Sequence, residues 1–165
     1  MRDDSILVLT TGGTIDKQYF DALSAYQITD TVIADLLDTA RVRKPFRILE
    51  VLRKDSLDLT DEDRVLIREK VEADPARQVV ITHGTDTMTE TAAALASLTD
   101  RTIVLVGALI PARFTATDAP FNLGMAFATA QVAPPGVYIT MNGTVFDALK
   151  VVKDREAGAF VAKSG

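Results

Sequence analysis

Short apolar runs rich in β-branched residues recur along the chain, and turn-forming or polar residues bound each of them. The runs do not alternate with polar positions, which is typical of strands buried on both faces of a parallel sheet. The pattern therefore predicts strands at residues 6–9, 48–52, 79–81, 103–106 and 137–139.

Apolar residues spaced three or four positions apart lie between these runs and predict helices around residues 32–40, 66–71 and 92–96. Thr60 with Asp63 and Thr87 with Glu90 resemble capping boxes at helix starts. We also expect Asp118 to cap a helix that has Pro120 in its first turn and runs to about residue 130.

The alternation of strands and helices indicates an α/β fold. We expect a doubly wound, mostly parallel sheet flanked by helices, a Rossmann- or flavodoxin-like three-layer sandwich. The length of 165 residues fits one domain, residues 1–165, and no linker or repeat suggests a second.

Composition narrows the classes of partner. Eighteen Lys and Arg scatter among 23 Asp and Glu, so we expect no nucleic-acid partner. The first residues include acids and only a short apolar run, which predicts neither a signal peptide nor a membrane anchor. Cysteine is absent, which fits a reducing compartment. We therefore expect a cytoplasmic protein with no membrane partner.

Two hydroxyl-rich turns, residues 10–15 and 82–87, each follow a predicted buried strand. The carboxyl ends of parallel strands are where ligands collect in such sheets. Gly12 and Gly13 allow a substrate to approach the backbone, and Thr14 is a candidate nucleophile that needs a base and oxyanion donors. Taken alone, the sequence of the first turn is more typical of an ordinary tight turn than of a catalytic one.

Two residues of the second turn have competing interpretations. Asp86 could hold a basic partner or cap the next helix. His83 is the only histidine, so we expect a structural hydrogen-bonding residue and no metal site. Neither turn has the glycine spacing of a dinucleotide fingerprint or the lysine of a P-loop.

Residues 9–15 and 83–92 resemble the two signature motifs of the bacterial-type L-asparaginases. Residues 106–111, 118–123 and 141–147 are similar to further segments of that family. The resemblance runs from about residue 6 to residue 160 and matches only the larger N-terminal domain of the family.

This resemblance implies an acyl-transfer site. Thr14 would be the nucleophile, Thr85 and Asp86 the threonine and aspartate of the second motif, and Lys153, rather than Lys150, their basic partner. A nearby carboxylate favours the charged amine, whereas a general base must be neutral. The resemblance also implies that the substrate site includes Gly13, Gly84 and Ala108.

A tyrosine after the first motif assists the nucleophile in this family, and Tyr19 and Tyr26 are both candidates here. Tyr19 is slightly favoured because it is close to Thr14, while Tyr26 lies at the more usual spacing, just before a helix expected to begin at residues 27–29. Residues 16–25 show no firm periodicity and are expected to form a mobile lid. Either ring could instead pack against the core.

Residues 54–59 resemble the family's segment for the substrate carboxylate. Asp55 and Ser56 would lie at that carboxylate, and Leu57 stands where many members have glutamine. We therefore expect a preference for asparagine over glutamine.

The resemblance as a whole implies an L-asparagine amidohydrolase with low activity on glutamine and without a metal or organic cofactor. A homo-oligomer, dimer or tetramer, is expected. The alternatives are a catalytically weak or inert module that binds asparagine or aspartate, and an amidase for another small amide.

Overall fold

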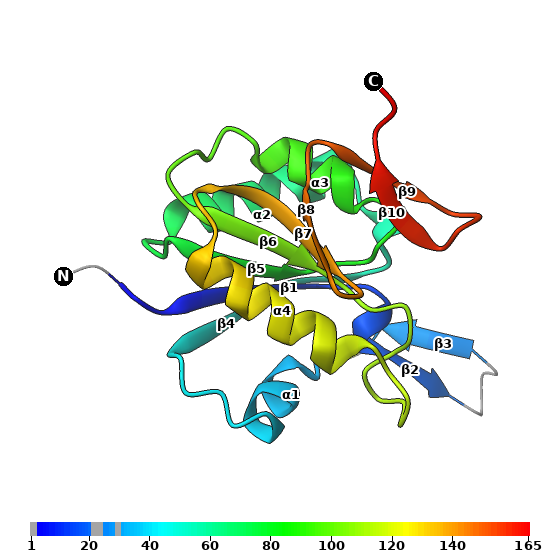
Figure 1. Cartoon of the computed structure of the whole chain (residues 1–165). Helices are drawn as coiled ribbons and strands as arrows, with labels where there is room; N and C mark the ends of the chain where they lie inside the picture. Colours follow the sequence, from blue (N-terminus) through cyan, green and yellow to red (C-terminus); the bar gives the residue numbers. More distant parts are fainter. Residues whose placement is uncertain (1–2, 21–24, 29–30) are drawn as a thin grey trace.

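The computed structural model of the chain describes residues 3–20, 25–28 and 31–165. At its centre is a six-stranded sheet in the order β4-β1-β5-β6-β7-β8 (Figure 1). Neighbouring strands from β4 to β7 are parallel, and β8 is antiparallel to β7. The strands are β1 (Ile6–Gly12), β4 (Phe46–Lys54), β5 (Gln78–Thr82), β6 (Thr102–Val106), β7 (Gly136–Met141) and β8 (Thr144–Asp147).

The predicted fold class is confirmed, and each predicted strand is present. The strands extend beyond the apolar runs. In β1, Thr10 and Thr11 continue the strand and are 1% exposed. The predicted strand ended at residue 9 because the next two residues carry polar hydroxyls, although β-branched threonine suits a strand well.

Helices cover both faces of the sheet. α1 (Ile33–Thr39) and α4 (Ala119–Val132) lie on one face, and α2 (Asp61–Ala73) and α3 (Met88–Leu95) on the other (Figure 1). Alternate residues of β1 enter the two cores, Ile6 and Val8 on the α1/α4 side, Leu7 and Leu9 on the other. Among the described residues, no helix combines the length and apolar character needed to cross a membrane.

The predicted capping box at Thr60 and Asp63 is confirmed. The other two predicted caps are wrong, because neither side chain accepts a hydrogen bond from a backbone N–H at the start of its own helix. The Thr87 hydroxyl donates to the Ser56 carbonyl at 2.7 Å. The Asp118 carboxylate accepts hydrogen bonds from other loop residues, described below.

The antiparallel strand β8 of the central sheet was not predicted, and neither were two antiparallel hairpins outside that sheet. The hairpins are β2 (Lys17–Phe20) with β3 (Ala25–Ile28), and β9 (Val151–Asp154) with β10 (Ala159–Ala162). Both lie at the same end of the molecule (Figure 1). The helix expected at residues 27–29 is wrong, since β3 ends at Ile28 and α1 begins at Ile33. Strands of four residues leave no long apolar run in the sequence.

Gly124 offers a direct test of helix stability. It lies inside α4, and a Cβ built there would meet no atom within 4 Å. Gly124→Ala should raise the free energy of unfolding by about 0.5–1 kcal/mol, because alanine loses less backbone entropy in a helix. Thermal and urea unfolding measure this gain.

Gly12→Ala is the opposite control. Gly12 has φ +101, and a Cβ there would lie 2.6 Å from the Lys54 backbone nitrogen. This variant should unfold more easily than the parent. A Gly124→Ala protein that is less stable than the parent would contradict the expectation for α4.

Candidate active site

The two hydroxyl-rich turns meet at one edge of the sheet. Thr14 begins the short 3-10 turn η1 (Thr14–Asp16) directly after β1, and Thr85 and Asp86 lie between β5 and α3. β5 lies beside β1 in the sheet. β4, the next parallel strand after β1 along the chain, lies on the opposite side of β1. This is the switch point of a doubly wound sheet, where such folds bind ligands.

Glycines bring the two turns into backbone contact. Gly13 has φ +85, and a Cβ there would lie 2.5 Å from the Gly84 nitrogen. A Cβ on Gly84 would in turn lie 2.6 Å from the Ser56 Oγ. Three segments that are far apart in the sequence therefore pack together only because both positions lack a side chain.

Lys153 joins this group from β9. Its Nζ donates to the Thr85 Oγ1 at 2.6 Å and to the Asp86 Oδ1 at 2.7 Å. The Lys153 side chain is only 16% exposed. A hydroxyl, a carboxylate and a largely buried amine are thus within hydrogen-bond distance, an arrangement that can move protons.

Besides Lys153, one further cation lies near Asp86, and the sequence did not predict it. Lys150, the alternative lysine, has a side chain that is 81% exposed and lies 3.6 Å from Asp147. Arg155, which was not predicted, places its Nε 3.8 Å from the same Asp86 oxygen that Lys153 contacts. Arg155 lies in the turn after β9, and because this hairpin was not predicted, no signal in the sequence placed it near Asp86.

The turn at residues 55–58 supports the loop that carries Asp86. Ser56 is buried, and its Oγ accepts a hydrogen bond from the Asp86 backbone N–H at 3.2 Å. Asp55 caps the 3-10 turn η3 (Ser56–Asp58) by accepting from the Leu57 N–H. The Leu57 side chain is exposed.

The pKa of Asp55 is lowered overall. Partial burial raises it, but the hydrogen bond from the Leu57 N–H, the contact with Lys17 and the charge of Lys153 lower it more. This carboxylate is therefore ionised at neutral pH beside the candidate site.

Asp118 holds the loop after β6, which contains the buried Ala108. Its carboxylate accepts from the backbone N–H groups of Leu109 and Ile110, each at 3.0 Å. It also accepts from two side-chain amides, those of Asn122 and Asn142. Burial raises the pKa of Asp118, but these donors lower it overall. The ionised Asp118 side chain thus holds two backbone N–H groups of the loop after β6.

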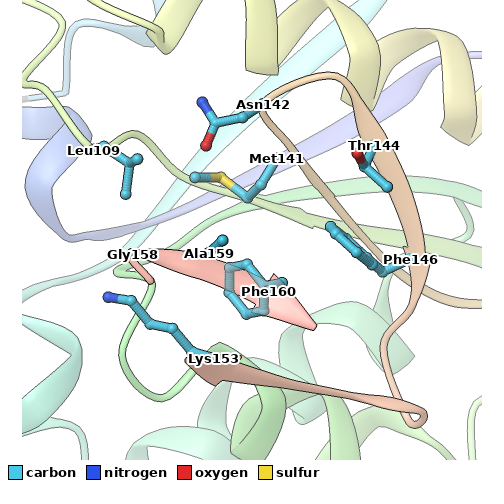
Figure 2. A pocket seen from close by; sticks show the side chains of 9 residues that line it. All are labelled: Leu109, Met141, Asn142, Thr144, Phe146, Lys153, Gly158, Ala159 and Phe160. Carbon is cyan, nitrogen blue, oxygen red and sulfur yellow. The ribbon is translucent and has the colours of Figure 1, made fainter. Parts of the chain in front are cut away.

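A cavity of about 130 Å³ opens beside Lys153. The lysine amine lies near one end of the cavity and Phe146 lines the other, with Phe160 between them (Figure 2). Thr14 does not line it. Within the described ranges, no three or more metal-binding side chains are arranged to hold an ion.

The two candidate tyrosines are paired in the β2–β3 hairpin, where Tyr19 lies opposite Tyr26 in the backbone register. Their side chains, and residues 21–24, lie outside the described part of the structure. The choice between them and the closure of a lid stay predictions.

His83 is buried and has a partner on each ring nitrogen. Because a carbonyl only accepts, Nδ1–H donates to the Gly84 oxygen at 2.6 Å, and Nε2 accepts from the Thr91 hydroxyl at 2.7 Å. Burial lowers the pKa of His83 to about 4, and the charge of Arg64 adds to this. The ring is therefore neutral and structural at neutral pH.

The single histidine permits a clean NMR measurement. The His83 imidazole should keep a constant chemical shift from pH 8 to pH 5.5 and titrate near pH 4. Between the ordinary pKa of about 6.5 and that value, the unfolded chain binds more protons, so stability should fall as the pH falls. A midpoint near 6.5 in the folded protein would contradict this assignment.

Comparisons with known proteins show the family to which the chain belongs. The family model "Asparaginase, N-terminal" matches residues 5–162. L-asparaginase 2 of Escherichia coli (strain K12) is 34% identical and aligns with 97% of this chain and 49% of its own length. A glutamyl-tRNA(Gln) amidotransferase subunit of Methanococcus vannielii is also 34% identical, over 88% of this chain and 36% of its own length.

A crystal structure of a probable cytoplasmic L-asparaginase from Campylobacter jejuni has the same fold, with a TM-score of 0.81 and 31% identity. The match covers 97% of this chain and 53% of that one. The chain therefore spans about half the length of the asparaginases it matches.

Proposed function

The chain belongs to the asparaginase family, and from this premise we propose that it hydrolyses the side-chain amide of L-asparagine to L-aspartate and ammonia. One observation carries the proposal. The Lys153 amine lies within hydrogen-bond distance of both Thr85 and Asp86, at the strand ends where the Thr14 turn packs against Gly84.

In the proposed first step, the Thr14 hydroxyl attacks the amide carbon and gives up its proton. Backbone N–H groups near Gly13 and Thr85 stabilise the oxyanion. The tetrahedral intermediate collapses when its C–N bond breaks, and the nitrogen leaves as ammonia after receiving a proton. The product of this step is an ester between the aspartyl group and Thr14.

In the second step, water attacks the ester carbon and releases aspartate, and its proton returns to the Thr14 oxygen. Thr85 carries protons between the reacting atoms and Lys153 in both steps. Asp86 holds the lysine in place by accepting a hydrogen bond from its amine.

Ammonia release from L-asparagine by the purified chain tests the proposal. A parent protein that releases ammonia is an amidohydrolase. A protein that binds aspartate without releasing ammonia is the inert binding module. Release from another small amide, but not from asparagine, supports the second alternative.

Substrate selectivity follows from Leu57, whose exposed side chain has no amide group. We expect kcat/KM to be higher for asparagine than for glutamine, by an amount equivalent to about 1–3 kcal/mol. Parallel ammonia assays on both amides measure the ratio. Leu57→Gln restores an amide at this position and should narrow the gap, whereas equal kcat/KM values in the parent would disprove the role of Leu57.

Three further expectations belong to this proposal. The protein assembles as a dimer or tetramer, and Phe121 of α4, 62% exposed, is available for contact. It works in the cytoplasm, as the Campylobacter jejuni relative is described. Tyr19, slightly ahead of Tyr26, assists Thr14 in attack.

An amidotransferase-like role, in which the ammonia is passed on, is the second candidate, because glutamyl-tRNA(Gln) amidotransferase relatives match the chain.

A further inference from the structure

A lysine three positions after Thr14 contacts the turn proposed to bind the substrate carboxylate. Lys17 begins β2 directly after η1, and its Nζ lies 2.9 Å from the Asp55 Oδ2. The two side chains are 26% and 31% exposed. Because of this limited exposure, solvent screens the pair less than a fully hydrated surface pair.

The two oxygens of Asp55 have separate partners. Oδ1 accepts from the Leu57 backbone N–H at 3.1 Å and fixes the start of η3. Oδ2 receives Lys17. One carboxylate therefore connects the end of the Thr14 turn to the turn that contains Ser56.

η3 is itself fastened to the loop of the second motif. The Ser56 Oγ accepts from the Asp86 N–H, and the Ser56 carbonyl accepts from the Thr87 hydroxyl. The Lys17–Asp55 contact thus extends a chain of links from the Thr14 turn, through η3, to the loop that carries Thr85 and Asp86.

The opposite side of the Thr14 turn is held by other bonds. The Ala112 N–H donates to the Ile15 carbonyl at 3.1 Å, and an Arg113 N–H donates to the Asp16 carbonyl at 2.8 Å. These bonds join the turn to the loop after β6. The ion pair joins the same turn to the segment proposed to hold the substrate.

We propose that Lys17 is a positioning residue whose ion pair with Asp55 holds the Thr14 turn at the right distance from bound substrate. This inference rests on the proposed function. Ser56 fixes the substrate carboxylate, so the position of η1 relative to η3 sets how closely the Thr14 hydroxyl approaches the amide carbon. Reaction rates depend steeply on such placement, with a shift of about 1 Å costing roughly 100-fold.

Lys17→Met removes the charge and keeps the length of the side chain. We expect kcat for asparagine to fall about 10-fold, less than a 1 Å misplacement costs, while KM changes by less than about 2-fold because Ser56 remains. Asp55→Asn should lower kcat by a similar factor, since its amide oxygen still accepts from the Leu57 N–H. Its KM also reflects the substrate carboxylate, because the family resemblance places Asp55 there. The double variant should lose no more than either single variant.

Two variants separate positioning from general effects of charge. Lys17→Arg keeps the ion pair and should retain most of the parental kcat. Lys44→Met removes a lysine that pairs with Asp4 at 2.8 Å, outside the proposed site, and should leave kcat unchanged. An unchanged kcat in Lys17→Met, equal losses in Lys17→Met and Lys17→Arg, or additive losses in the double variant would each overturn the proposal.

Hydrogen exchange distinguishes this inference from the proposed function. The backbone amides of residues 14–17 should exchange faster in Lys17→Met and Asp55→Asn than in the parent or in Lys17→Arg. If the parent releases no ammonia from asparagine, the proposed function fails, and the exchange rates still decide whether the pair anchors this turn. Unaltered exchange in both variants would refute the anchor.

Discussion

Replacing Thr14 by alanine should lower kcat for asparagine by about 10⁴-fold or more, because the proposed covalent route through the threonine ester would be lost. Thr14 lies in η1 on a short turn and is only half-buried, so little packing is lost with its side chain. We therefore expect the variant to fold as the parent does. Ammonia release and thermal unfolding, measured on the same samples, check both statements.

The intermediate identifies which threonine attacks. Mass spectrometry of rapidly quenched reactions should find the aspartyl group on the peptide that contains Thr14. Thr14→Ser keeps a hydroxyl and should retain far more activity than Thr14→Ala. An aspartyl ester on Thr85, or full activity in Thr14→Ala, would exchange the roles of the two threonines.

Lys153→Met should lower kcat by about 10²–10⁴-fold, the usual contribution of a positioned acid or base. Methionine fills nearly the same space but cannot accept or donate a proton in the relay proposed for Thr85. The loss should persist at every pH at which the protein is folded, because no other group replaces the amine. Steady-state kinetics across the pH range measures this.

Lys150→Met is the matched control. It removes a lysine three positions earlier, at a side chain that is 81% exposed and lies beside Asp147. Kinetics within about 2-fold of the parent are expected, since a surface ion pair contributes little. Equal losses in the two lysine variants would contradict the assignment of Lys153.

The sequence predicted the five parallel strands of the central sheet because apolar residues dominate each of them, and three of these strands, β1, β5 and β6, are almost wholly buried. The antiparallel β8 of the same sheet was not predicted. The sequence pattern did not predict short strands that pair with a strand close to them along the chain. Lys17–Phe20 and Ala25–Ile28 form strands of four residues that pair with each other, and such short strands have no buried run to detect. The pairing of Tyr19 with Tyr26 likewise depends on register, which a sequence pattern leaves open.

The candidate site was predicted in part. Spacing along a resembling segment selected Lys153, and the structure places its amine beside Thr85 and Asp86. The caps expected from Thr87 and Asp118 are wrong because a capping pattern considers only the helix that follows. Both side chains bind loops from elsewhere in the chain, and only the tertiary structure determines those partners.

The lysine of the site comes from β9, which follows all the parallel strands of the sheet along the chain. A ribosome adds about 5–20 residues per second, so Thr14 is synthesised on the order of ten seconds before Lys153. Every strand of the six-stranded sheet is already made by then. A nascent chain therefore has the strands of the sheet before it has the Lys153 amine, and the proposed hydrolysis begins only after translation has passed the β9–β10 hairpin.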